Sequence, residues 1–232
     1  MRDACRIVPG AQAKFDSRAT DDKLGLDKAT AEADNARLTN RLSELHNRLW
    51  AEHARSVLLI LQGLDASGKD GMIRRVFTGL NPQGCQVHSF KAPSPIEKDH
   101  DFLWRLHSVL PERGDIGIFN RSHYEDVTAA QVVGAIDDHE RKRLQARLDD
   151  PEKRWKFQRG DLDTRAKWDT YIKLYDDAIT ATSTKWAPWY VVPADRKWVS
   201  GHIVATILVD TLHELDPQYP PPSPDLDGLR VE

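Results

Sequence analysis

The sequence of 232 residues has little cysteine, no long hydrophobic run and almost no net charge. Its two cysteines, Cys5 and Cys85, give neither a disulfide framework nor the spacing of a zinc site, so we expect a reducing, cytoplasmic setting. The longest strongly apolar stretches, Val57–Leu61 and Ile203–Val209, are far shorter than the ~20 residues of a membrane-spanning helix. The first residues lack the apolar segment of a secretory signal. A formal charge of −3 argues against general nucleic-acid binding.

The chain contains enough apolar residues to form a core, and its predicted strands and helices alternate along the sequence. Hydrophobic residues make up 40% of the chain. Short apolar runs with the character of buried strands alternate with helical patterns, which predicts an α/β fold with a parallel sheet. We expect strands at 56–62, 85–90, 115–119 and 189–192, and helices at 21–55, 69–78, 96–110, 137–148, 161–182 and 197–215. Residues 1–20 read as a loose arm.

The first of these helical patterns carries a single apolar stripe. Leu38, Leu42, Leu45 and Leu49 recur at spacings of four, three and four, which places them on one helix face. We interpret this stripe as a packing surface, with a partner-binding coiled coil as the alternative.

A phosphate-binding loop follows the first predicted strand. The stretch Gly63-Leu-Asp-Ala-Ser-Gly-Lys69 matches G-x-x-x-x-G-K, in which backbone N–H groups cradle phosphate oxygens and the lysine adds a full positive charge. Asp70 stands where Ser or Thr usually contacts magnesium, so a metal would be held differently, with help from Asp65. A carboxylate inside such a loop repels phosphate, and Asp65 is therefore our candidate for metal binding or for orienting the attacking phosphate. A loop-capping role is the alternative.

A second group of functional residues follows the predicted strand at 115–119. Residues just beyond the carboxyl end of a parallel strand face the ligand crevice. Arg121 is placed there to bridge phosphates, while Glu125 and Asp126 could hold a metal or simply begin a helix. His123 could act as a general base, although we favour a structural hydrogen bond for it.

A basic segment lies further along the chain. Arg141–Arg159 contains eight basic and three acidic residues, and its second half mixes cations with Trp155 and Phe157. A loop of this composition could close over a polyanion and neutralise charge during phosphoryl transfer. Nucleic acid is the competing polyanion, which the acidic remainder of the chain disfavours.

Taken together, these segments resemble the polyphosphate kinase 2 family of P-loop kinases. The resemblance rests on seven ordered motifs: Leu61–Gly71, Asn81–Gly84, Ser89–Pro93, His100–Arg105, Ile118–Val127, Arg147–Phe157 and Ala187–Trp198. It implies a three-layer kinase-like domain at 56–217 with a lid at about 141–182, preceded by an arm and helix at 1–55 and followed by a proline-rich tail at 218–232.

The resemblance also implies an activity and a set of site residues. The activity is phosphoryl transfer between inorganic polyphosphate and a nucleoside mono- or diphosphate, with Mg²⁺ or Mn²⁺, in a homo-oligomer (a dimer or tetramer) that binds neither nucleic acid nor membrane. The catalytic residues would be Asp65, Lys69 and Arg121, with Asp65 on the metal. Phosphate binding would involve Gly63, Ala66, Ser67, Gly68, Lys69, Asp70, Arg74, Lys153, Arg154 and Lys156, and nucleotide binding Phe90, Lys91, Asn120, Arg121 and Glu125.

The chain departs from the family between the motif Ile118–Val127 and the basic lid. Family members usually place a helix, a core strand and a second helix there, which needs about 43 residues. Positions 120–150 supply 31. A core strand is therefore expected to be missing or replaced. We predict that residues 131–136 or 189–192 pair beside the strand at 56–62, or else that this sheet edge is open.

Two other functions remain compatible with the motifs. A conventional kinase using ATP would need the same phosphate loop, and a non-catalytic relative that only binds polyphosphate would follow if activity was lost with the shortened segment. The ordered motifs and the basic lid favour the polyphosphate-dependent kinase.

Overall fold

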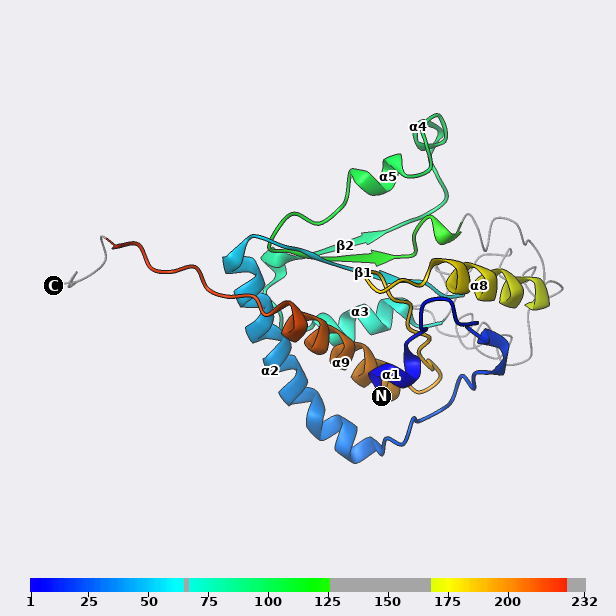
Figure 1. Ribbon diagram of the computed structural model, residues 1–232, viewed down its shortest axis with the longest axis horizontal. Coiled ribbons are helices and arrows are strands. Elements are labelled where there is room, and N and C mark those ends of the chain that lie inside the picture. The colour runs from blue at the N-terminus through cyan, green and yellow to red at the C-terminus, as the bar shows by residue number, and fades with distance from the viewer. Residues whose placement is uncertain (65–66, 126–167, 225–232) are drawn as a thin grey trace, which may run out of the picture.

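The computed structural model describes residues 1–64, 67–125 and 168–224, and it places a three-stranded parallel sheet at the centre of the chain (Figure 1). The strands are β1 (Val57–Leu61), β2 (Cys85–Ser89) and β3 (Ile116–Asn120), in the order β1-β3-β2. The pairing aligns Leu61 and Ser89 with Asn120, so all three strands end at the same level. The predicted α/β class and the first three strands are confirmed.

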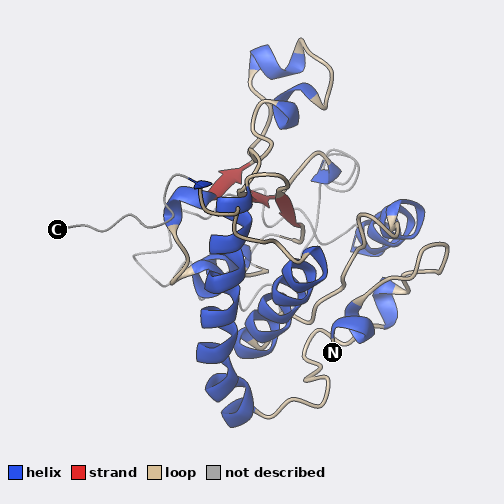
Figure 2. Ribbon diagram, turned by 60° about the vertical axis from the view of Figure 1, so that its left-hand side comes forward, coloured by secondary structure: helices blue, strands red, loops and turns tan. Residues whose placement is uncertain are grey.

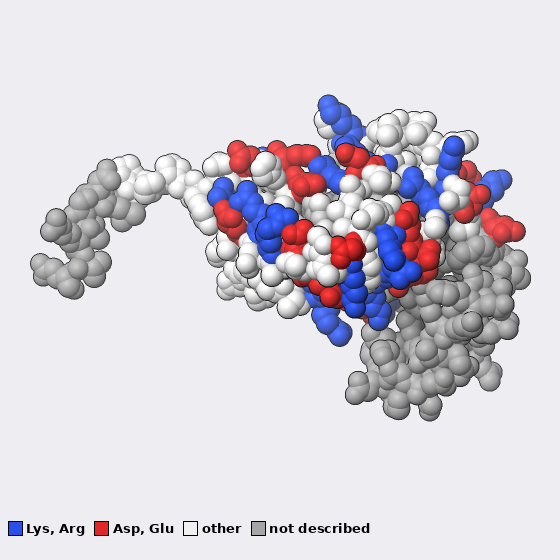
Figure 3. Space-filling view, turned by 90° about the horizontal axis from the view of Figure 1, so that it is seen from below, with Lys and Arg blue, Asp and Glu red and all other residues white. Residues whose placement is uncertain are grey.

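Three helices cover one face of this sheet. They are α2 (Lys28–Glu52), α3 (Lys69–Phe77) and α9 (Lys197–Leu215). Of these three, α9 has the bounds that the sequence predicted. All four leucines of the α2 stripe are buried, and Leu42, Leu45 and Leu49 pack with Ile116 and Ile118 of β3 and with α9, so the packing interpretation is confirmed. The backbones of α2 and α9 lie side by side (Figure 2). Outward-facing charges on α2 pair with one another, and Figure 3 shows acidic and basic side chains mixed over this side of the molecule.

The opposite face is covered by a shorter excursion of the chain. Phe119 packs there with Phe90 and Leu106. The sequence predicted one helix over 96–110, and this is wrong: two single turns form instead, α4 (Pro95–Lys98) and α5 (Trp104–His107). Between them, the Asp101 carboxylate accepts a hydrogen bond from the backbone N–H of Leu103, which is the local competition that breaks helices at aspartate.

The N-terminal segment is part of the core. It contains α1 (Arg2–Cys5) and the 3₁₀ turn η1 (Phe15–Ser17). Elsewhere in the chain, a second 3₁₀ turn, η2 (Pro82–Gly84), precedes β2. Cys5, Ile7 and Ala13 are buried against α9 and against α8 (Trp168–Thr182), so the prediction of a loose arm is wrong. Side-chain spacing gave little sign of this, because the three buried residues are spread over nine positions with Pro9 and Gly10 between them.

The predicted strand at 189–192 is also wrong. Tyr190 makes one antiparallel bridge with Arg6, and the flanking prolines Pro188 and Pro193 leave no room for a longer ladder. In the described part of the chain β1 pairs only with β3, so 189–192 does not lie beside β1 as a strand. Residues 131–136 and the predicted helix at 137–148 lie outside the described residues. Within the described ranges, no helix has both the length and the apolar character to cross a bilayer.

Helix α2 begins at Lys28 rather than at Asp21. Asp27 caps it, because its carboxylate accepts hydrogen bonds from the backbone N–H groups of Ala29 and Thr30 at 2.9 and 3.1 Å. Two residues earlier, Gly25 has φ of +77°, a turn conformation that favours glycine.

The buried His46 of α2 gives a testable dependence of stability on pH. Its Nε2 lies 2.9 Å from the carbonyl oxygen of Gly84, and a side chain at Gly84 would come within 2.6 Å of that nitrogen. Burial lowers the pKa of His46 below its usual 6.5, and the hydrogen bond to Gly84 and the negative charge of Asp115 oppose this only in part. Because the unfolded state then binds the proton more readily, the free energy of unfolding should fall as pH drops below about 6.5. We expect urea denaturation at pH 8 and pH 5.5 to show a smaller difference for His46→Gln, which retains a polar group but does not titrate. Equal pH dependence in both proteins would contradict this role.

Candidate functional site

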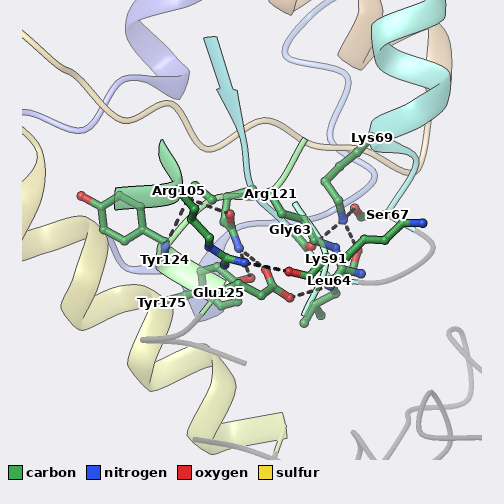
Figure 4. Close-up of polar contacts among 12 residues, drawn as sticks. Gly63, Leu64, Ser67, Lys69, Lys91, Arg105, Arg121, Tyr124, Glu125 and Tyr175 are labelled. Atoms are coloured by element: carbon green, nitrogen blue, oxygen red, sulfur yellow. Dashed lines mark hydrogen bonds and ion pairs between the residues drawn. The ribbon is translucent and has the colours of Figure 1, made fainter. Parts of the chain in front are cut away.

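The candidate site lies where the three strands end together. Leu61, Asn120 and Ser89 form one row across the sheet, and the chain leaves this row into the phosphate loop, into Arg121 and into Lys91. In open parallel sheets ligands bind outside the carboxyl ends of the strands. Figure 4 shows the side chains of Lys69, Arg121 and Glu125 gathered at this end of the sheet.

The phosphate loop joins β1 to α3. Gly68 precedes α3 with φ of +93°, a conformation that other residues rarely adopt, and a side chain at Gly63 would press against Ser67 Oγ at 3.0 Å. The Lys69 ammonium donates hydrogen bonds back onto the loop, to the carbonyl oxygens of Gly63 at 2.6 Å and Leu64 at 2.8 Å and to Ser67 Oγ at 3.2 Å. These hydrogen bonds hold the charge of Lys69 at the mouth of the loop. Asp65 and Ala66 lie outside the described residues.

Arg121 is fixed by a small polar network behind the loop. Its Nη1 contacts Glu125 Oε1 at 2.9 Å, and the side-chain amide of Gln62 donates to the other oxygen of the same carboxylate. Gln62 also lies 3.5 Å from the hydroxyl of Tyr175 on α8. The backbone of Arg121 has φ of +68°, and its N–H donates to the Leu61 carbonyl at 2.9 Å. An arginine in this left-handed conformation costs about 1–2 kcal/mol, which the surrounding contacts must offset.

A second pair joins α3 to the end of β3. The Asn120 side-chain Nδ2 donates to Asp70 Oδ1 at 2.9 Å and lies 3.5 Å from Ser89 Oγ. The other end of the amide, Asn120 Oδ1, is buried and has no hydrogen-bond partner in the described part of the chain. This pair therefore brings one carboxylate and one buried amide oxygen to the level of the phosphate loop.

Phe90 and Lys91 lie on the far side of β3 from the loop strand. Phe90 is only 6% exposed: the Arg105 guanidinium lies 5.3 Å from the centre of its ring, and Phe119 meets the ring edge to face. The ring thus forms part of the core behind the site and has little surface to offer a base. Lys91 is exposed, and its carbonyl accepts a hydrogen bond from Arg105 at 2.9 Å.

The remaining predicted residues are less closely grouped. Arg74 is exposed on α3, one turn beyond Asp70. The ring of His123 lies between those of Phe102 and Tyr124, at centroid distances of 6.1 and 4.5 Å, an aromatic setting that gives no support to a general base. Asp126 and the lid cations Lys153, Arg154 and Lys156 lie outside the described residues.

Sequence reasoning missed four residues that shape the site: Gln62, Ser89, Arg105 and Tyr175. Gln62 and Ser89 stand at strand ends, so the rule that drew attention to Arg121 could have identified them. Arg105 and Tyr175 reach the site only through the packing of α5 and α8, which no local pattern reveals.

The parallel sheet, the phosphate loop opening α3 and the paired Arg121 define a protein of the P-loop kinase class. Comparison with known proteins identifies the family within this class. The family model for Polyphosphate kinase 2 matches residues 25–143 and 135–220, and the chain belongs to this family.

Individual relatives agree with this assignment. An AMP/ADP-polyphosphate phosphotransferase of Meiothermus ruber is 41% identical over 94% of each chain. An ADP-polyphosphate phosphotransferase of Rhodopseudomonas palustris is 40% identical, covering 79% of this chain and 80% of its own. The crystal structure of polyphosphate kinase 2 from Arthrobacter aurescens matches with a TM-score of 0.87 at 37% identity, covering 96% of this chain and 93% of that one.

The comparisons also bear on the shortened segment. The alignment with the Meiothermus ruber protein runs over 253 positions, more than the 232 residues of this chain, so that protein has residues with no counterpart here. The two stretches matched by the family model meet at residues 135–143, inside the segment that the sequence predicts to be shortened.

Proposed function

We propose that this protein transfers a phosphoryl group between inorganic polyphosphate and a nucleoside mono- or diphosphate. The observation that carries the proposal is the meeting of Lys69 and the Arg121–Glu125 pair at one end of the sheet, in a chain of this family. Polyphosphate and nucleotides both present strings of phosphate oxygens, and such a site offers backbone N–H groups, an ammonium and a guanidinium to them.

The reaction requires little covalent participation by the protein. A phosphate oxygen of the acceptor forms a bond to the terminal phosphorus of polyphosphate, and the bridging P–O bond to the next phosphate breaks, so the shortened polyphosphate leaves as an anion. The attacking oxygen is already an anion, so no strong general base is needed. Lys69 and Arg121 then act by position and charge, stabilising the oxygens on which negative charge develops. The reverse reaction uses the same contacts.

Mg²⁺ is the proposed cofactor, with Mn²⁺ as a substitute. Mg²⁺ usually keeps several waters and takes phosphate oxygens as ligands, so one or two carboxylates from the protein are enough to hold it. Asp70, the neighbouring Asn120 oxygen and Asp65 are the donors that the chain offers to it. When bound, the ion would neutralise phosphate charge and hold the phosphates in line.

The deciding experiment is analysis of nucleotide products. Purified protein is mixed with long-chain polyphosphate, Mg²⁺ and either AMP or ADP, and the products are separated by ion-exchange chromatography. We expect ADP or ATP to appear and to disappear when polyphosphate is omitted. Phosphorylation that requires ATP and ignores polyphosphate would instead establish a conventional kinase. Polyphosphate binding without any product would establish a non-catalytic relative.

The proposal extends to where and in what form the protein acts. We expect a dimer or tetramer in the cytoplasm that binds no nucleic acid. The two cysteines are unpaired thiols, as in reducing compartments. Ile96, Phe102 and Trp104 are 65%, 58% and 43% exposed around α4 and α5, a setting that favours contact with another protein surface. Sedimentation velocity and binding to labelled DNA would test both expectations.

A further inference from the structure

The pair formed by Asp70 and Asn120 reverses an arrangement common in P-loop proteins. There, a Ser or Thr directly after the loop lysine and an Asp from the strand next to the loop strand hold Mg²⁺. In this chain Asp70 directly follows Lys69, and Asn120 ends β3, the strand that pairs with β1. The carboxylate has moved from the strand to the helix, and a neutral side chain occupies the strand position.

The contacts within the pair show how the exchange is accommodated. Asn120 Nδ2 donates to Asp70 Oδ1 at 2.9 Å, and a hydrogen bond of this kind favours the ionised carboxylate. An aspartate at position 120 would instead place two carboxylates side by side, and one of them would be driven to take up a proton. The neutral amide of Asn120 therefore orients the Asp70 carboxylate without adding a second carboxylate at position 120.

The unsatisfied oxygen of Asn120 indicates that the pair is incomplete without a ligand. Asn120 Oδ1 is buried and has no hydrogen-bond partner among the described residues, while the nitrogen of the same amide faces Asp70 and Ser89. Buried polar atoms are rarely left without a partner. A hydrated cation beside Asp70 would supply water O–H groups to this oxygen, and carboxylate and amide oxygens are donors that suit Mg²⁺.

We propose that Asp70 is a side chain through which this protein contacts the divalent cation of its phosphate substrates, and that Asn120 positions it. The inference rests on the proposed function for the identity of the substrates. Metal binding can be measured without turnover, so an experiment can contradict the role of Asp70 and the proposed function independently of each other.

The test measures binding of Mn²⁺ alone, without nucleotide or polyphosphate, from the electron paramagnetic resonance signal of the free ion. We expect Asp70→Ser to weaken Mn²⁺ binding by about tenfold or more, because it removes the charged ligand. The double variant Asp70→Ser, Asn120→Asp restores one carboxylate in the common P-loop arrangement, and we expect it to regain most of that loss. Asp169→Ser is the matched control, because Asp169 is likewise an exposed aspartate on a helix.

The outcomes separate the alternatives. Unchanged Mn²⁺ affinity in Asp70→Ser, or wild-type protein that binds no Mn²⁺ at millimolar concentration, overturns the proposal. Failure of the double variant to recover binding overturns the exchange between the two positions. If circular dichroism shows that Asp70→Ser does not fold, Asp70→Asn of nearly the same shape takes its place. Wild-type protein that shows the expected metal pattern but forms no nucleotide product contradicts the proposed function and leaves this inference standing.

Discussion

Replacing Lys69 with alanine is expected to lower kcat for polyphosphate-dependent phosphoryl transfer by about 10³-fold or more. The Lys69 ammonium is the full positive charge at the mouth of the phosphate loop, held there by Gly63, Leu64 and Ser67. Phosphate oxygens would take over these hydrogen bonds, and the interaction strengthens as charge accumulates on the transferred group. Initial rates with saturating polyphosphate and nucleotide measure the effect on kcat.

The control separates this role from damage to the loop. Lys98→Ala removes an exposed lysine at the end of α4, away from the loop, and should retain wild-type rates. Because Lys69 also links parts of the loop, a melting curve of Lys69→Ala must accompany the kinetics. Transfer at a rate within tenfold of wild type, in a folded variant, would reject the proposed role of Lys69.

Removing the guanidinium of Arg121 is the second large effect that we expect. Arg121→Ala and Arg121→Gly should both lower kcat by about 10³-fold, since each removes a charged fork able to bind two phosphate oxygens. The two variants should differ in stability. With φ of +68° at this position, glycine is tolerated better than alanine, so Arg121→Gly should exceed Arg121→Ala in free energy of unfolding by about 1 kcal/mol.

Comparison of these two variants distinguishes chemistry from backbone conformation. If Arg121→Ala and Arg121→Gly lose the same activity but differ in free energy of unfolding, the loss of activity comes from the missing guanidinium. Recovery of activity in Arg121→Gly alone would show instead that the loss in Arg121→Ala reflects distortion of the chain after β3. Urea denaturation and steady-state kinetics on the same preparations are sufficient.

The parts of the fold that could be predicted are those governed by local pattern. The apolar run at Val57–Leu61 and the glycine-rich turn after it specify a strand, a loop and a helix within a short stretch of chain. Local pattern also predicted α9, which begins directly after Arg196 and ends directly before Asp216. The meeting of Lys69 with Arg121 followed from the rule that parallel strands end together.

The parts that could not be predicted depend on contacts between distant segments. Cys5 and Ile7 are buried only because α9 and the chain at Trp189 lie against them. Phe90 resembles a surface for a nucleotide base until Arg105 and Phe119 are seen to pack on it. The Asp70–Asn120 hydrogen bond joins residues 50 positions apart, and neither neighbourhood alone suggests it.

The docking of the N-terminal segment sets an order on events during synthesis of the chain. Ile7 donates its N–H to the carbonyl of Trp189 at 2.9 Å, and Arg2 forms an ion pair with Glu214 near the end of α9. Ile7 and Arg2 therefore find these partners only after positions 189 and 214 have been synthesised. Until then the apolar Ile7 and Cys5 have no native surface to cover them, and contacts of such long sequence separation form slowly. Growing chains of this protein should accordingly need protection from aggregation until the segment at 189–214 has emerged.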